Sequence, residues 1–245
     1  MLPELKFALS QKLDYEIAWS FYQNPKRGGV DFWQERVFGI HKQLGNIDLA
    51  VNNKEYFLNK FVKGYYKKNR LILQNRKRCI ERLYAGKSKK FFEITKEIFK
   101  NHPWPKGKYI CFVSIFDFSP RFLEDKTFQV YAFSTKKTVL FTIFHEMTHF
   151  IFYDYAIKKY PKIFQTLDAN KGLFWDLGEI FNSTMHRSDL FFKLHGEIND
   201  PYYPEHRKYL KALSKLWLKD PDIDSWLLHA LELLKNKKVL LTRRK

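Results

Sequence analysis

Apolar residues recur at helical spacing through the first part of the chain. Residues 1–50 carry stripes such as Leu13, Ile17 and Phe21, and residues 53–84 carry similar stripes among many basic side chains. Apolar side chains three or four positions apart share one face of a helix, so both stretches are predicted to be helical. We expect these helices to serve as a scaffold.

Polar and small residues predict where these helices divide. Gly64 and the polar run 67–70 favour a break in the second stretch. Ser88 is predicted to cap a further helix, because a serine hydroxyl can accept a hydrogen bond from the first helical turn. This helix carries Phe91 and Phe92 and is expected to end before Pro103.

After Gly107 the pattern changes from helical to extended. Residues 108–118 and 127–133 are rich in aromatic and β-branched side chains and are bounded by turn residues, so both are predicted to be strands. The loop between them would allow an antiparallel ribbon. Ser134 or Thr135 is then placed to cap the next helix. The pattern predicts an α+β fold that is mostly helical.

Helical periodicity returns in the last third of the chain. It predicts an apolar helix at residues 172–183 and two terminal amphipathic helices at 204–218 and 222–235. We therefore expect a helical, basic N-terminal region at 1–107, a core at 108–187 and a C-terminal helical region at 188–245, together forming one compact unit.

The predicted helix after the strands contains the run His145-Glu146-Met147-Thr148-His149. Two histidines four positions apart lie on one face of a helix, with the glutamate beside them. Their ring nitrogens can bind one Zn²⁺, and Glu146 is then placed to accept the proton of a water that the metal activates. The alternative is a buried histidine pair without a metal, although burying these groups without partners is costly.

The flanks of this run resemble the extended signature of the zincin metallopeptidases. Thr142 stands three residues before the first histidine, Met147 and Thr148 between the ligands are uncharged, and Ile151 is an apolar residue two positions after the second histidine. The resemblance implies a zinc metallopeptidase, a hydrolase that acts on peptide bonds. It also implies a zincin-like core, in which a small sheet that includes antiparallel strands packs over the active-site helix.

Zinc in a catalytic site usually has three protein ligands, so a further ligand is expected. The metzincins are excluded, because Phe152 and Tyr155 stand where that class carries a glycine and its third ligand. SprT-like proteases use a histidine shortly downstream, but none occurs between His149 and His186. Cys111 does not lie in the cysteine motif of the peptide deformylases.

Residues 108–187 are similar in pattern to the gluzincins and their minimal relatives, the minigluzincins. In these enzymes a glutamate on a later helix completes the metal site, and Glu179 matches that role, with Asp176 one turn earlier as the alternative ligand. Asn182 and Ser183 occupy positions where many gluzincins carry another acidic residue. The family often adds a Tyr or His that stabilises the oxyanion. Five later residues stay open for this role: His186, His195, Tyr202, Tyr203 and His206.

The chain is strongly basic, with a formal net charge of +18. Thirteen Lys and Arg residues but only two Glu lie between residues 54 and 90. This region could meet nucleic acid, an anionic membrane surface or an acidic protein. The alternative function is therefore a nucleic-acid-associated basic protein whose zincin core is degenerate or structural.

Cysteine usage and the apolar segments point to a cytoplasmic protein. Cys79 and Cys111 lie in unrelated contexts, which argues against a disulfide framework. The start of the chain lacks the pattern of a signal peptide. The apolar stretch 139–157 includes charged and metal-ligating residues, so we expect no membrane span. The pattern leaves the oligomeric state open.

Overall fold

The computed structural model describes residues 2–27, 29–49, 53–197 and 203–242. It is mostly helical and contains a small mixed sheet, which confirms the predicted α+β class. The chain divides into two compact units. Pro3–Gly86 and Gly107–Ile143 form the first, which we call the sheet unit. Lys87–Lys106 and Phe144–Lys245, with the first two residues, form the second, which we call the helical unit.

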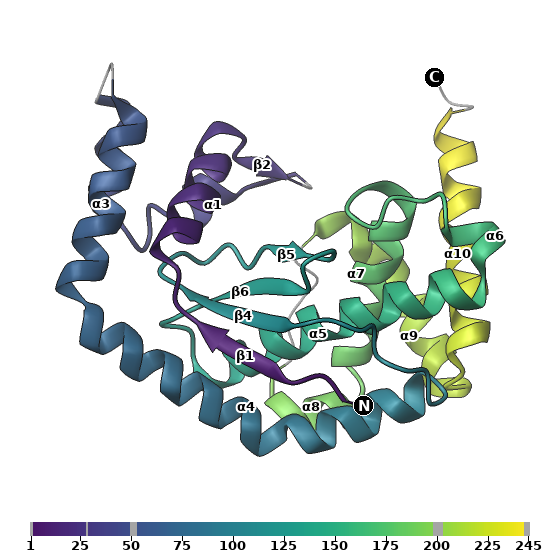
Figure 1. Cartoon of the computed structure of the whole chain (residues 1–245). Coiled ribbons are helices and arrows are strands. Elements are labelled where there is room, and N and C mark those ends of the chain that lie inside the picture. The colour runs from purple at the N-terminus through teal and green to yellow at the C-terminus, as the bar shows by residue number, and fades with distance from the viewer. Residues whose placement is uncertain (1, 28, 50–52, 198–202, 243–245) are drawn as a thin grey trace. The chain divides into compact units, whose positions relative to one another are not determined.

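The sheet unit is built around four strands in the order β1-β4-β6-β5 (Figure 1). The two central strands, β4 (Tyr109–Ser114) and β6 (Thr127–Tyr131), pair in parallel. β1 (Leu5–Ala8) pairs in parallel with β4, and β5 (Arg121–Phe122) pairs antiparallel with β6. The core of this unit follows the central strands, where Tyr109, Cys111, Val113, Phe128 and Val130 are buried.

The two strands predicted after Gly107 are confirmed, but their predicted antiparallel pairing is wrong. The register places Cys111 opposite Phe128 in a parallel ladder. β5 carries the chain back along the edge of the sheet, and a short turn that includes Lys126, with a φ of 54°, forms the antiparallel hairpin instead. Strand composition indicates an extended segment but does not specify which neighbour it pairs with.

The prediction that residues 1–50 are helical is only partly confirmed. α1 (Gln11–Gln23) begins after Ser10, whose side chain accepts a hydrogen bond from Leu13 N, and α2 (Phe32–Arg36) follows later. Three short strands were missed because so few residues give no periodic signal. They are β1, which precedes α1, and the hairpin of β2 (Lys26–Arg27) and β3 (Val30–Asp31). A 3₁₀ helix (Lys42–Leu49) precedes α3.

α3 (Lys54–Lys68) and α4 (Arg70–Ile98) meet at Asn69, within the run that was predicted to break the helix. The second predicted boundary is wrong, because Ser88 lies inside α4 and not at the start of a helix. The buried residues Tyr84 and Phe91 on either side of it keep one apolar face continuous, so the helix has no reason to end there.

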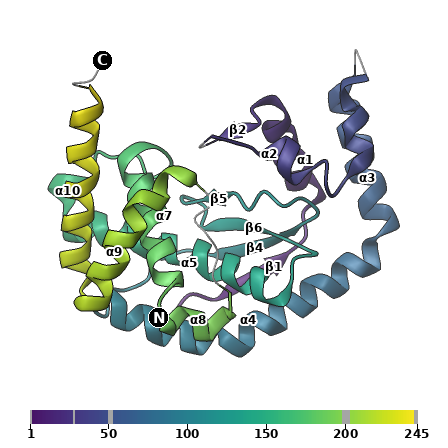
Figure 2. The ribbon, with the colours of Figure 1, turned by 180° about the vertical axis from the view of Figure 1, so that it is seen from behind.

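The helical unit contains the helices that carry the motif and the candidate third ligand. Thr135 Oγ1 accepts a hydrogen bond from Thr138 N, so Thr135, one of the two predicted caps, begins the motif helix. Figure 2 shows α7, α9 and α10 side by side, as their contacts require. Among the described residues no helix is both long and apolar enough to cross a membrane. The elements are the end of α4 from Lys87, the part of α5 (Lys136–Lys159) after Ile143, α6 (Pro161–Phe164), α7 (Gly172–His186), α8 (Asp189–His195), a 3₁₀ turn (Pro204–His206), α9 (Arg207–Lys219) and α10 (Ile223–Thr242).

Candidate metal centre

The motif histidines lie in the middle of α5, on a segment that is largely buried, with His145 its half-buried member. Ile143, Met147 and Ile151 are fully buried around them. His149 is fully buried as well, and Glu146 is 6% exposed. A helix without a polar face becomes part of the core, so the sequence places imidazole and carboxylate groups in a largely dry environment.

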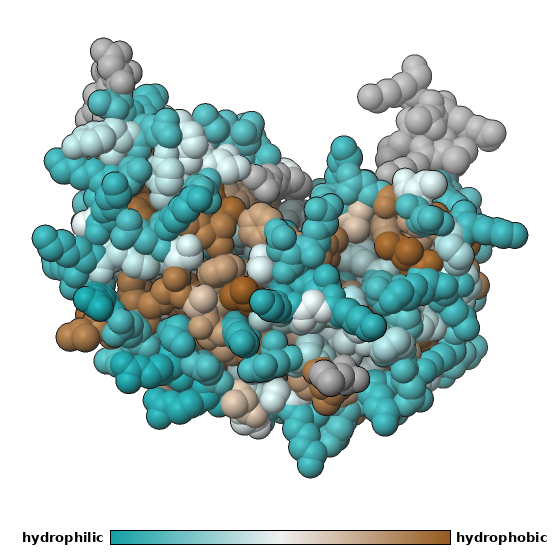
Figure 3. Space-filling model, in the orientation of Figure 1, coloured by the Kyte–Doolittle hydropathy of each residue, from teal (hydrophilic) through white to brown (hydrophobic). Residues whose placement is uncertain are grey.

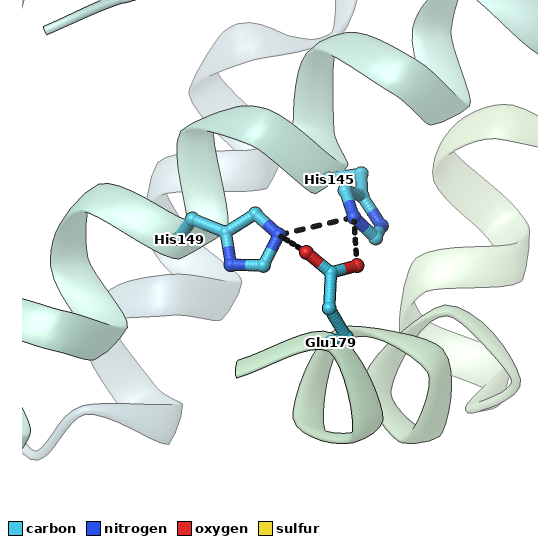
Figure 4. Close-up of side chains that lie close together, drawn as sticks. All are labelled: His145, His149 and Glu179. Atoms are coloured by element: carbon cyan, nitrogen blue, oxygen red, sulfur yellow. Dashed lines mark hydrogen bonds and ion pairs between the residues drawn. The ribbon is translucent and has the colours of Figure 1, made fainter. Parts of the chain in front are cut away.

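Three side chains from two helices point toward one another (Figure 4). His145 Nε2 and His149 Nε2, both from α5, are 3.1 Å apart. Glu179 on α7 places Oε2 3.3 Å from His145 Nε2 and Oε1 3.2 Å from His149 Nε2. Each carboxylate oxygen therefore faces one imidazole, and both imidazoles present the same ring nitrogen.

The histidines keep the carboxylate of Glu179 ionised. Burial by itself raises the pKa of Glu179, but the charge of His149 and hydrogen bonds with both histidines outweigh it and hold the pKa well below its usual range. Two imidazole nitrogens and one carboxylate are a common ligand set for catalytic zinc. The three donor groups lie within 4.8 Å of one another, so they fit a single metal ion. The described part of the chain holds no other such group of His, Cys, Asp or Glu.

α7 approaches α5 closely because position 178 has no side chain. A Cβ on Gly178 would lie 2.2 Å from Tyr153 Oη and 2.7 Å from Tyr153 Cζ, far inside van der Waals contact. Tyr153 lies one turn after His149 on α5, and its ring stacks on that imidazole with centroids 5.6 Å apart and planes 7° apart. Gly178 thus lets Glu179 reach the histidines while Tyr153 packs against His149.

A buried amide also joins the two helices at this point. Asn182, 1% exposed and one turn after Glu179, donates a hydrogen bond from Nδ2 to the backbone carbonyl of His145 at 3.1 Å. The side chain that stands where many gluzincins have an acid therefore binds the backbone of α5. This contact fixes the position of α7 beside the first motif histidine.

The alternative ligand, Asp176, lies apart from the converging donors. Its Oδ1 is 3.0 Å from Nε2 of His206, which is buried beside the ring of Trp175. The structure therefore brings Glu179 to the motif histidines and pairs Asp176 with one of the five candidates for oxyanion stabilisation.

The remaining oxyanion candidates have different surroundings. His186 stacks on His145 with ring centroids 5.6 Å apart and contacts His195, whose Nε2 is 3.0 Å from His186 Nδ1. Tyr203 packs against Trp175. Tyr202 lies outside the described residues. Of the described candidates, His186 is thus in contact with a motif histidine.

The pair of His186 and His195 has a defined arrangement of protons. Burial lowers the pKa of His195 to about 4. Burial, followed by unfavourable electrostatic interaction with His145, His195 and His149, lowers the pKa of His186 well below its usual range. Both rings are therefore neutral at neutral pH. Glu197 N donates to His195 Nδ1 at 3.1 Å, so His195 donates its Nε2 proton to His186 Nδ1, and His186 carries its own proton on Nε2.

The roles of Tyr153 and Asn182 were not predicted from the sequence. Tyr153 had a signal, because positions 145, 149 and 153 are each four apart and share a helical face. The contact of Asn182 depends on how α7 packs on α5, which no local pattern shows. Gly178 differs, because a residue without a side chain next to Glu179 already indicates that this helix can approach its neighbour closely.

Comparison of the chain with protein-family models, with curated proteins and with solved structures finds no match. The assignment of this centre therefore rests on the ligand types and on their convergence.

Proposed function

We propose that the chain is a zinc-dependent metallopeptidase with a gluzincin-like site. The observation that carries the proposal is the convergence of His145, His149 and Glu179 from two helices on one point. The position of Glu146 between the two histidines in sequence adds the base that such a hydrolase needs. A bound Zn²⁺ would lower the pKa of a water molecule and polarise the carbonyl group of a peptide bond.

The three ligands would hold the metal with one negative charge. His145 and His149 would each offer one ring nitrogen, and Glu179 would offer its ionised carboxylate. With a single negative charge among them, these three ligands would leave a bound divalent ion net positive, which would favour negative charge on a substrate oxygen.

Glu146 would act as the general base. Its carboxylate would accept a proton from the attacking water and return it to the leaving amine. Because the side chain is 6% exposed, little bulk water would compete for that proton.

We further infer a zincin-like core from the order of elements. Strands β4 and β6 are followed by the motif helix α5 and the glutamate helix α7, the order that the resemblance to gluzincins implies. The antiparallel pair β5–β6 supplies the antiparallel component expected of such a sheet.

The proposal is tested with a mixture of fluorogenic peptides and purified full-length protein. Wild-type protein is expected to cleave peptides, to lose this activity with a chelator and to regain it with added Zn²⁺. Glu146→Gln removes the base but keeps the shape, so turnover should fall at least about 100-fold while the zinc content stays unchanged. Glu93→Gln, on an exposed residue of α4, is the matched control and should keep full activity. Cleavage that survives the chelator or Glu146→Gln would refute the proposal.

A further inference from the structure

A dense group of free cations surrounds the point where α3 meets α4. Seven exposed Lys and Arg side chains lie here, and none has an acidic partner among the described residues. Other basic residues of the same helices are engaged: Lys54 pairs with Asp48, and Lys77 pairs with Glu81. The seven are Lys60, Lys63, Lys67, Lys68, Arg70, Arg78 and Arg82. Together with Leu71 and Ile72, they form what we call the corner surface.

Two aliphatic side chains project into water among these cations. Leu71 is 72% exposed and Ile72 is 51% exposed, and both follow directly after Arg70 at the start of α4. In the space-filling view, hydrophobic surface lies beside hydrophilic surface where the two helices meet (Figure 3). Large exposed apolar side chains that sit together within a polar surround mark an interaction site.

The helical period places Leu71 on one face of α4 with two of the cations. Leu71, Arg78 and Arg82 are seven and eleven positions apart on α4, so they project from one side of that helix. Lys60, Lys63 and Lys67 form a similar row on α3. The corner surface therefore combines a row of positive charge on each helix with two exposed apolar side chains at the start of α4.

We propose that the corner surface docks on a bilayer that contains anionic phospholipids. The seven cations complement the negative headgroups, and each Lys or Arg near such a surface strengthens binding about fivefold. Leu71 and Ile72 would insert into the boundary between headgroups and acyl chains, where aliphatic side chains leave water. This is peripheral binding and requires no membrane-spanning helix.

The two exposed apolar side chains favour a bilayer over nucleic acid as the partner. Single-stranded nucleic acids bind through cations and stacked aromatic rings, and duplexes bind through cations and hydrogen-bond donors. Two projecting aliphatic side chains contribute little to either mode. A bilayer instead uses both components of the corner surface. The proposal is independent of the metal centre.

Co-sedimentation of the full-length chain with vesicles tests the proposal. We expect binding to phosphatidylcholine vesicles that contain phosphatidylserine, little binding to pure phosphatidylcholine, and release at high salt. Lys67→Glu/Lys68→Glu/Arg70→Glu should weaken binding more than about 100-fold, since three attractive charges are reversed. Leu71→Ser/Ile72→Ser should weaken binding at least about tenfold.

Matched controls separate the corner surface from the general positive charge of the chain. Lys159→Glu/Lys162→Glu/Lys219→Glu makes the same charge change on exposed residues elsewhere, and Leu218→Ser alters a leucine that is 77% exposed. Both controls should bind nearly as well as wild type. If Leu71→Ser/Ile72→Ser loses its circular dichroism signal, Leu71→Ser alone replaces it.

Three results would overturn the proposal. The first is no binding to phosphatidylserine vesicles at low salt. The second is an equal loss of binding in the two triple charge variants. The third is that the chain binds a DNA or RNA oligonucleotide more tightly than the vesicles, and that Leu71→Ser/Ile72→Ser does not change its affinity for the oligonucleotide. This result would make the corner surface a nucleic-acid site.

Discussion

His195 determines which nitrogen of its neighbour carries a proton. Its Nδ1 accepts from the backbone of Glu197, so its Nε2 donates to His186, whose ring lies against the first motif histidine. The chain therefore supports His145 with a neutral, hydrogen-bonded imidazole instead of a second positive charge. A neutral ring beside His145 would not repel a bound metal ion, as a second positive charge would.

The depressed pKa of His195 predicts how stability depends on pH. Its pKa is about 4 in the folded chain and near 6.5 when unfolded, so between these values the unfolded state binds more protons. The free energy of unfolding should therefore fall as the pH drops from about 6.5 to about 4. His195→Gln keeps a hydrogen-bond donor and an acceptor but cannot titrate. The free energy of unfolding of this variant should therefore fall less steeply than that of wild type, and the two slopes should differ by up to about 1.4 kcal/mol per pH unit.

Urea unfolding of both proteins at several pH values, with a chelator present, measures this difference. Burial also raises the pKa of Asp14 to about 6, which favours the folded state at low pH, but that effect is common to both proteins and cancels. Parallel curves for the two proteins would show that His195 is not neutral in the fold.

Single residues of the centre differ in how far the sequence could predict them. The placement of His145 and His149 on one helical face follows from their spacing alone, because helical geometry is local. The preference for Glu179 over Asp176 came from the resemblance to gluzincins and from the apolar neighbours of Glu179, among which an unpaired acid is costly to bury. That Asp176 is held by His206, from another part of the chain, could not be predicted from local pattern.

At the scale of elements, the centre depends on how closely α7 lies against α5. Gly178→Ala tests this contact. On helix propensity alone, the Gly178→Ala protein would be more stable than wild type by about 1 kcal/mol. The added Cβ would instead meet Tyr153 at 2.2 Å, so we expect a net destabilisation of about 1–2 kcal/mol and weaker zinc binding.

Gly64→Ala is the matched control for this substitution. Gly64 lies on an exposed part of α3, and a methyl group added there would meet no described atom within 4 Å. Alanine should therefore stabilise the chain by about 0.5–1 kcal/mol. Thermal or urea unfolding compares the two variants. A Gly178→Ala protein as stable as Gly64→Ala would contradict the close approach of the two helices.

The elements themselves were partly predictable. Long segments with strong periodicity, such as α1, α7 and α9, were found because the pattern repeats over several turns. The pairing of β4 with β6 was not, because two residues of β5 decide the direction in which the chain returns. The Ser88 boundary failed since a capping residue also fits the interior of a helix whose apolar face continues past it.

At the scale of the whole molecule, each unit is assembled from separate segments of the chain. Two boundaries, between residues 86 and 87 and between residues 143 and 144, fall inside α4 and α5. Sequence signals for boundaries come from polar or Pro- and Gly-rich linkers, and a continuous helix offers none. The expected regions 1–107, 108–187 and 188–245 were drawn from changes in pattern and stay a prediction.

The zinc content of the purified chain tests the central claim most directly. Wild type and two conservative variants on α7 are purified without a metal-chelating column. The number of zinc ions per chain is then measured by inductively coupled plasma mass spectrometry. We predict about one Zn²⁺ per chain in wild type and in Asp176→Asn, and a loss of most of the zinc in Glu179→Gln, because Glu179 is the carboxylate beside the two histidines. Wild-type protein without zinc, or equal zinc in Glu179→Gln and wild type, would contradict the metal centre described above.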